Sequence, residues 1–261
     1  MDTNGTLYLC ATPIGNLEDI TYRVLRTLKE VDLIAAEDTR NSIKLLNHFE
    51  IHTPMTSYHE YNKIEKAYQL VEQLRQGKNI ALITDAGTPG ISDPGEELVR
   101  IALEEGIRVT SLPGAAACIT ALTMSGQPTR RFTFEAFLPR EKKERAKILE
   151  ELHEVLGNRS ISLCRELTKK YEDVQKTTLE DVLLYFKDHE PRGEYVLVIS
   201  GKERKELEEQ AQKAWEELSF SEHMAIYEAQ EIPRKEAMKL VAKDRGISKR
   251  DVYQALLAEE S

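Results

Sequence analysis

Residues 80–95 of the chain read IALITDAGTPGISDPG, and this stretch decides the fold class. Residues 80–84 are a short, mostly apolar run, which is typical of a fully buried strand. Residues 85–95 hold three glycines and two prolines, a density that neither a helix nor a sheet ladder accepts. Residues 96–105 then place Leu98, Ile101 and Ala102 at helical spacing. The stretch therefore predicts a strand, a loop and a helix.

Such a loop lies where open α/β sheets bind ligands, at the carboxyl end of a strand. Glycines let the backbone approach a ligand closely, and free backbone N–H groups attract anionic groups. A single loop of this kind is equally compatible with a well-made turn.

The same strand–loop–helix pattern recurs in residues 6–30, 32–49 and 107–125, and residues 64–75 add a further helix. Alternation of this kind predicts a mostly parallel sheet with helices on both faces. Since parallel strands end at one edge, four unusual strand ends should converge there and form a ligand cleft. They are TPIGN (12–16), EDTR (37–40), the loop 85–95 and PGA (113–115).

Composition narrows the class of protein. The chain has 261 residues, which suggests roughly two domains, and a net charge of −9. It has no apolar run near the about 18 residues of a membrane helix, and residues 1–5 are too short and polar for a signal peptide. Each of the three cysteines lies in an apolar run (Cys10, Cys118 and Cys164). This is typical of core residues in a protein from a reducing compartment. We expect a cytoplasmic protein.

Several common sites are absent from the sequence. It contains neither a P-loop nor G-x-G-x-x-G after a strand, so it lacks the usual signals of triphosphate or dinucleotide binding. It has no H-E-x-x-H and no G-x-S-x-G. His48 and His52 are four apart, but Thr53 and Pro54 end any helix there. We therefore expect no metal site.

The second half begins after a candidate linker, residues 125–131. Strands are expected over 132–138, 160–164 and 194–200, and helices over 142–156, 179–187 and 202–218. The predicted organisation is an N-terminal α/β domain with the ligand loops (1–125), a C-terminal α/β domain (132–220) and a basic helical tail (233–261).

The tail carries a net charge of +4 over residues 233–257, from seven Lys and Arg against three acids. Two helices are expected, over 233–245 and 249–259, and Ser248 with Asp251 predicts a capping box for the second. A basic helical pair suits RNA phosphates, but a helical cap with a solvated rim has the same pattern. Residues 140–147 are a second basic stretch.

Long motifs in order resemble one family. They are TPIGNLEDIT (12–21), AEDTR (36–40), SYHEYN (57–62), ITDAGTPGISDPG (83–95), SLPGA (111–115), FEAFLP (134–139) and RELTK (165–169). The chain resembles the small-subunit ribosomal RNA methyltransferases of the tetrapyrrole-methylase superfamily, which methylate the ribose 2′-hydroxyl of a cytidine. The resemblance implies two α/β domains with S-adenosylmethionine between them, a homodimer, and small-subunit ribosomal RNA as substrate.

The resemblance also assigns the cofactor loops. It places Pro13 and Gly15 in the first loop and Pro113, Gly114 and Ala115 beside the adenosine. The central loop contributes Asp85, Ala86, Gly87, Thr88, Pro89, Ser92 and Asp93.

Catalytic roles are less constrained by the sequence. Asp38 is the first candidate for a base or a positioning role, with Glu37 and Arg40 beside it, although these three residues could equally form a structural ion-pair cluster. Lys169 is a candidate for binding phosphate. Proximity and orientation of the reactants can lower the reaction barrier by roughly 7–11 kcal/mol. This is a larger effect than the rate increase of about 10²–10⁴ that one general base provides.

The sequence departs from the family at Tyr61, where the family has His, and at Ala136, where it has Gly. It also lacks a strand and a segment like FYESPHR between residues 139 and 165. Two alternatives therefore stay open: a methyltransferase for a tetrapyrrole or another small molecule, and a non-catalytic ribosome-associated protein that binds the cofactor.

Overall fold

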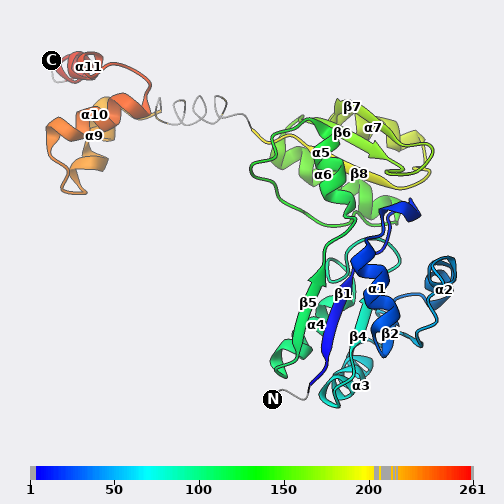
Figure 1. Cartoon of the computed structure of the whole chain (residues 1–261). Helices are drawn as coiled ribbons and strands as arrows, with labels where there is room; N and C mark the ends of the chain where they lie inside the picture. The colour runs from blue at the N-terminus through cyan, green and yellow to red at the C-terminus, as the bar shows by residue number, and fades with distance from the viewer. Residues whose placement is uncertain (1–3, 203–205, 207–212, 214, 216, 260–261) are drawn as a thin grey trace. The chain divides into compact units, whose positions relative to one another are not determined.

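The computed structural model describes residues 4–202, 206, 213, 215 and 217–259. They fall into two compact units, unit 1 (Met1–Ser200) and unit 2 (Gly201–Ser261), each described here by itself (Figure 1). The helix expected over 202–218 lies largely outside the described residues. Within the described part of the chain, no helix combines the length and apolar character needed to cross a bilayer.

Unit 1 begins with a five-stranded sheet in the order β3-β2-β4-β1-β5. Every strand pair in it is parallel, which confirms the α/β prediction of a mostly parallel sheet with its strand ends at one edge. The strands are β1 (Thr6–Cys10), β2 (Leu33–Ala36), β3 (Met55–Ser57), β4 (Ile80–Ile83) and β5 (Arg108–Leu112). Only the short edge strand β3 was not expected.

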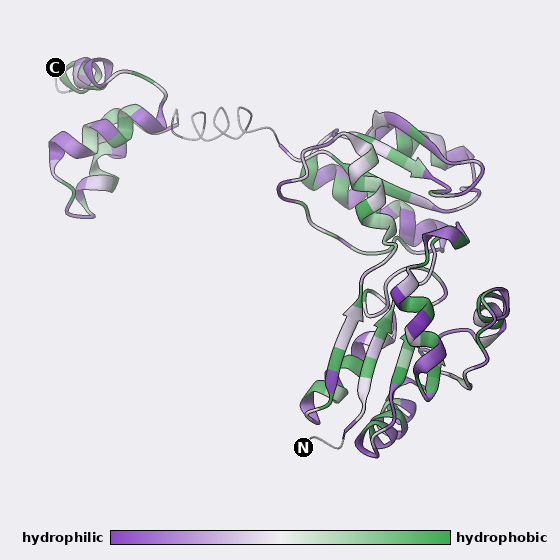
Figure 2. Cartoon of the chain, in the orientation of Figure 1, coloured by the Kyte–Doolittle hydropathy of each residue, from purple (hydrophilic) through white to green (hydrophobic). Residues whose placement is uncertain are grey.

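Helices cover both faces of this sheet because its strands are apolar on both sides. Leu7 packs with α3 (Lys63–Arg75) and α4 (Gly95–Glu104). Cys10, three residues further along β1, packs with α1 (Tyr22–Glu30) and α2 (Thr39–His48) on the other face. Figure 2 shows mostly green and white colouring along these strands, with purple at the start of β5, and alternating green and purple on the helices.

The start of α1 illustrates how local signals set these helices. The Thr21 side chain accepts a hydrogen bond from the Val24 N–H, as an N-cap should. Of Asp19 and Thr21, the two caps that the sequence offers, Thr21 is therefore confirmed. The sequence also predicts an apolar face of Tyr22, Leu25 and Leu28. Leu28 is fully buried and Leu25 packs against the core, as predicted, but Tyr22 is 93% exposed.

The second half of unit 1 is a three-stranded antiparallel sheet in the order β7-β6-β8. Helix α5 (Ala117–Ser125) packs on it through Ala121, which contacts the cluster of Cys164 and Leu167. The elements are α6 (Lys142–Leu156), β6 (Ser160–Arg165), β7 (Asp173–Thr178), α7 (Leu179–Asp188) and β8 (Tyr195–Ile199). Strand β7 was not expected.

Residues 132–138 were expected to be a strand, and this prediction was wrong. The segment has no regular secondary structure, and Phe132, Phe134 and Phe137 are 54%, 40% and 72% exposed. A strand needs a neighbour that offers backbone N–H and C=O groups. No described strand pairs with this segment, so its β propensity stays unused.

Unit 2 is a small helical cluster of α9 (Phe220–Glu228), α10 (Arg234–Asp244) and α11 (Lys249–Glu259). Its core is apolar and contains Met224, Val241 and Leu256. Both helices of the predicted basic pair are confirmed, and α9 was not expected. The capping box is present: the Asp251 N–H donates to Ser248 Oγ at 3.2 Å, and the Ser248 N–H donates to Asp251 Oδ2 at 3.1 Å.

Candidate active site

The loops after β1 and β4 are joined directly at the edge of the sheet. The Thr12 N–H donates to the Gly87 carbonyl at 2.9 Å, and the Gly87 N–H donates back to the Thr12 carbonyl at 3.1 Å. The Thr12 hydroxyl also donates to the Thr84 carbonyl at 3.1 Å. Because β1 and β4 are neighbours, two sequence-predicted loops come together here.

The loop after β5 packs against the other two, and glycine makes this possible. A Cβ on Gly114 would lie 2.6 Å from the Ala11 Cβ, closer than side chains can approach. Gly87 has φ +83°, and a Cβ there would lie 3.3 Å from Ile14 Cγ2 and 3.5 Å from the Ala115 carbonyl. The Thr88 hydroxyl donates to the same carbonyl at 3.1 Å. All three predicted cofactor loops therefore meet.

Asp93 organises the central loop from within. Its carboxylate accepts hydrogen bonds from the N–H groups of Gly90, Ile91 and Gly95, at 2.8, 3.3 and 2.7 Å. Burial raises its pKa, against the effect of these hydrogen bonds. The buried Tyr58 hydroxyl donates to the Pro94 carbonyl at 2.8 Å and fixes the end of the loop. Asp93 is thus engaged by its own loop, while Ser92 is exposed.

The side chains of the EDTR motif (37–40) form a hydrogen-bonded cluster at the end of β2. Glu37 accepts a hydrogen bond from the Thr84 hydroxyl at 2.6 Å, which ties β2 to β4. Asp38 caps α2 by accepting from the Arg40 N–H at 2.9 Å. It also accepts from the Arg40 guanidinium at 3.0 and 2.7 Å. These hydrogen bonds lower the pKa of Asp38 to about 2, which makes it a weak base.

The turn over residues 166–169 packs on the first cofactor loop. A Cβ on Gly15 would lie 2.7 Å from Lys169 Cγ and 2.9 Å from the Thr168 hydroxyl. Lys169, a sequence candidate for binding phosphate, therefore lies beside the first cofactor loop. Its amine, however, lies 2.7 Å from Glu194 Oε2 and 3.2 Å from Glu166 Oε1, and the hydrogen bond to Glu194 raises its pKa. Two carboxylates already neutralise the charge expected to bind phosphate.

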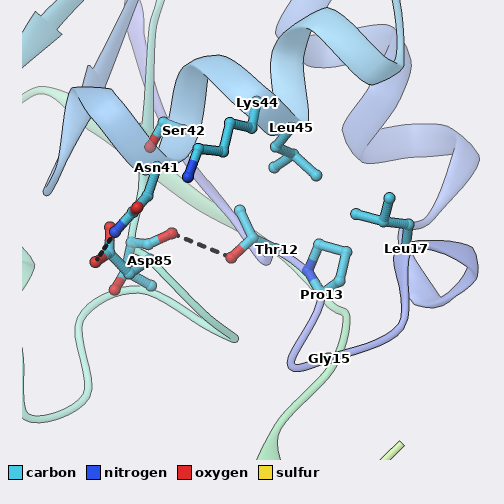
Figure 3. A pocket seen from close by; sticks show the side chains of 10 residues that line it. Thr12, Pro13, Gly15, Leu17, Asn41, Ser42, Lys44, Leu45 and Asp85 are labelled. Carbon is cyan, nitrogen blue, oxygen red and sulfur yellow. Dashed lines mark hydrogen bonds between the residues drawn. The ribbon is translucent and has the colours of Figure 1, made fainter. Parts of the chain in front are cut away.

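A cavity of about 280 Å³ lies between the first loop and α2 (Figure 3). The Asn41 amide, on α2, donates to Asp85 Oδ2 at 3.1 Å across this cavity. The residues that line the cavity are Thr12, Pro13, Gly15, Leu17, Asn41, Ser42, Lys44, Leu45, Thr84 and Asp85. Sequence reasoning missed Asn41 and Lys44, although their spacing of three on a helix that follows EDTR puts them on one face.

Within the described residues, no group of His, Cys, Asp or Glu side chains is arranged to hold a metal ion. The described cysteines, Cys10, Cys118 and Cys164, are all free thiols, and burial raises the pKa of Cys164. The polar groups at the sheet edge are instead backbone amides, hydroxyls and carboxylates that accept hydrogen bonds from the protein itself. This arrangement suits an organic ligand held between loops.

Comparison with known sequences identifies relatives over nearly the whole chain. The family described as Tetrapyrrole (Corrin/Porphyrin) Methylases matches residues 6–145. A protein of Halalkalibacterium halodurans is 48% identical over 97% of this chain and 94% of its own length. One of Bacillus subtilis is 45% identical over 96% and 94%. Both bear the name Ribosomal RNA small subunit methyltransferase I.

Solved structures share the fold at low identity. A diphthine synthase is similar with a TM-score of 0.59 and 15% identity, over 76% of this chain and 90% of its own. A uroporphyrin-III C-methyltransferase of Thermus thermophilus in complex with S-adenosyl homocysteine gives 0.53 and 16%, over 75% and 92%. These likenesses confirm the fold class predicted from the sequence.

The alignment with the Halalkalibacterium protein also contains a gap. It has 275 positions, whereas 97% of the 261 residues is about 253, so about 22 positions have no residue of this chain. The relative has residues at those positions. Their number is sufficient for the strand and the FYESPHR-like segment that the sequence lacks.

Proposed function

This chain belongs to the tetrapyrrole (corrin/porphyrin) methylases, and from that premise we propose that it is an S-adenosylmethionine-dependent methyltransferase of small-subunit ribosomal RNA. We assign the ribose 2′-hydroxyl of a cytidine as the methylated group. The main support for this substrate is the sequence identity of 40–48%, over nearly the full chain, with proteins named as methyltransferases of this RNA.

The three joined loops fit the cofactor. Gly87 and Gly114 let the loops pack more closely than a Cβ would allow, so the three loops form one continuous backbone surface for the cofactor. When bound, the cofactor supplies a methyl group on a positively charged sulfur. The proposed contacts are Pro13, Gly15, Asp85, Ala86, Gly87, Thr88, Pro89, Pro113, Gly114 and Ala115. Ser92 belongs to the same loop, and Asp93 supports it through backbone hydrogen bonds.

Positioning residues then account for the chemistry without a metal. Asp38 and Arg40 set the start of α2, Glu37 ties β2 to β4 through Thr84, and the Lys169 ion pairs hold the turn beside Gly15. Alignment of reactants can supply roughly 7–11 kcal/mol. We therefore assign these four residues to positioning, and the low pKa of Asp38 argues against its use as the base.

Unit 2 supplies a candidate RNA surface. Helices α10 and α11 are joined by a four-residue turn with Gly246, and Lys235, Lys243 and Arg250 are exposed on them. Phosphate contacts by such side chains give affinity that falls with salt. Substrate binding by these helices accounts for a basic tail on a chain whose net charge is −9.

The active form we propose is a homodimer in the cytoplasm, where ribosomal RNA is found. The exposed phenylalanines of residues 132–137 support self-association, since such apolar side chains gather at protein interfaces. Light scattering coupled to size-exclusion chromatography tests this directly. A wild-type monomer at micromolar concentration would contradict the dimer.

A second function is favoured by the alignment gap alone. A chain without about 22 positions of its relative could bind the cofactor and the ribosome without turnover. Methylation of a tetrapyrrole is the third candidate, but the sequence identity to the uroporphyrin-III C-methyltransferase is only 16–19%.

Transfer of labelled methyl to unmodified small ribosomal subunits separates these functions. The proposal predicts label on small subunits and none on large subunits or uroporphyrinogen III. Cofactor binding by calorimetry without transfer to any of the three would support the non-catalytic protein, and label on uroporphyrinogen would support the small-molecule enzyme.

A further inference from the structure

The cavity of Figure 3 extends beyond the proposed cofactor loops. It shares Pro13, Gly15 and Asp85 with them, but none of its lining residues comes from residues 86–95 or from 113–115. Its other wall is α2, through Asn41, Lys44 and Leu45. A ligand in this cavity would therefore lie beside a cofactor held by the loops, with Asp85 between the two.

We propose that this cavity binds the target nucleotide, with Asp85 accepting the proton of its ribose hydroxyl and Lys44 contacting its phosphate. The inference rests on the proposed function and names the substrate site within it.

The size and lining of the cavity suit one nucleotide. Ligand pockets usually measure about 300–1,000 Å³, and this cavity, at about 280 Å³, lies at the small end of that range, as expected for a single nucleotide. Pro13, Leu17 and Leu45 give it an apolar side for a sugar or base, and Asn41, Lys44 and Asp85 give it a polar side. Such a mixture is typical of sites that fix the orientation of a small polar ligand.

Asp85 differs from the other two carboxylates at this edge of the sheet. Asp38 is held by Arg40, and Glu37 accepts from Thr84. Asp85 is exposed, and its Oδ2 accepts from the Asn41 amide. Its Oδ1 accepts no hydrogen bond from the part of the chain that the structure describes. Asn41 thus orients a carboxylate that keeps one oxygen available to a hydroxyl group.

Lys44 supplies the positive charge. It follows Asn41 by one helical turn, so both side chains lie on one face of α2, as Figure 3 shows. The Lys44 side chain is exposed and forms no ion pair with any described residue. Arg40 and Lys169, the other cations near the site, are already paired with carboxylates. Among the residues that line the cavity, Lys44 is therefore the cation that remains available to a phosphate.

The chemical step balances with these groups. Asp85 takes the hydroxyl proton while the ribose oxygen bonds to the methyl carbon, and the electron pair of the broken methyl–sulfur bond stays on sulfur. A positioned carboxylate of this kind contributes about 10²–10⁴ in rate.

Two variants test the site, each with a matched control. Lys44→Gln should weaken binding to unmodified small ribosomal subunits about tenfold and lower the salt slope by about 1. Asp85→Asn should keep subunit affinity within threefold and, at saturating cofactor, lower the single-turnover rate at least 100-fold. Lys29→Gln and Asp188→Asn change exposed residues outside the cavity and should match the wild type.

Subunit binding is measured without the methyl donor, so Lys44 is judged even if the wild type transfers no methyl group. Equal binding of Lys44→Gln and Lys29→Gln would overturn the phosphate contact. A full-rate Asp85→Asn variant would remove Asp85 as the proton acceptor. Loss of cofactor affinity in Asp85→Asn to the same degree as activity would mean that this residue acts in cofactor binding alone and not as the proton acceptor. Circular dichroism and thermal unfolding confirm that each variant is folded.

Discussion

Thr12 and Gly87 exchange two backbone hydrogen bonds, of 2.9 and 3.1 Å, across a gap of 75 residues in sequence. This bridge joins the loops after β1 and β4. The Thr88 hydroxyl, next to Gly87, donates to the Ala115 carbonyl and so attaches the loop after β5. The three loops thus form one surface whose shape depends on close backbone contacts. Changes that separate the loops should weaken cofactor binding more than they weaken folding.

Gly87→Ala should weaken S-adenosylmethionine binding at least tenfold by calorimetry. Gly87 has φ +83°, and its new Cβ would lie 3.3 Å from Ile14 Cγ2. Gly106→Ala is the matched control because Gly106 has φ +69° with no atom within 4 Å of the added Cβ. Left-handed backbone costs each variant about 1–2 kcal/mol of stability. Equal cofactor affinity in the two variants would contradict the loop assignment.

Tyr58→Phe should destabilise unit 1 by about 1–2 kcal/mol, because it leaves the buried Pro94 carbonyl without its hydrogen bond. Urea unfolding measures this loss. The control is Tyr68→Phe, since Tyr68 is 58% exposed on α3 and should change stability by less than about 0.5 kcal/mol. A Tyr58→Phe variant as stable as this control would show that the hydroxyl does not support the central loop.

Acid should destabilise unit 2 through His223. Burial lowers the pKa of this fully buried side chain. Arg245 donates to its Nδ1 at 3.2 Å, Asp244 lies 3.3 Å from Nε2, and Trp215 and Tyr227 stack on its ring. Below about pH 6.5 the histidine is protonated in the unfolded chain but stays neutral in the folded protein. The free energy of unfolding therefore falls by up to about 1.4 kcal/mol per pH unit as the pH decreases.

Fluorescence of Trp215, the one tryptophan in the sequence, reports this unfolding because its ring lies 3.9 Å from that of His223. Denaturant titrations between pH 7.5 and 5 should show the loss in the wild type and a smaller slope in His223→Gln. Stability that rises as the pH falls would mean that the Asp244 carboxylate outweighs burial.

The basic face of unit 2 should set the salt dependence of RNA binding. A Lys243→Gln, Arg250→Gln double variant should lower the slope of log affinity against log salt by about 2. Lys66→Gln, on α3 of unit 1, is the control and should leave the slope unchanged. An equal slope in all three proteins would leave α10 and α11 as a structural cap.

Local signals explain what could be predicted from the sequence. The repeated strand, loop and helix predicted the parallel sheet, and the Thr21 cap and the Ser248–Asp251 box were correct because both act within four residues. Strand β3 has only three residues and β7 is largely polar, so neither has a clear apolar period. Their pairing with distant strands determines them.

The remaining misses depend on tertiary contacts. Residues 132–138 have the composition of a strand, but no described strand pairs with them. Lys169 was a candidate for binding phosphate, but neither its position beside Gly15 nor its pairing with Glu194, 25 residues away, could be read from the sequence. Asn41 and Lys44 became site candidates only because α2 packs beside the first loop and forms the cavity with Asp85.

Mapping the methyl group on small-subunit ribosomal RNA tests the central claim most directly. Unmodified small subunits are incubated with the protein and labelled S-adenosylmethionine, and the RNA is digested to nucleosides and analysed by mass spectrometry. The account predicts label in 2′-O-methylcytidine at one position, lost in Asp85→Asn and kept in Asp188→Asn. Label on a base, or none despite measured cofactor binding, would contradict it.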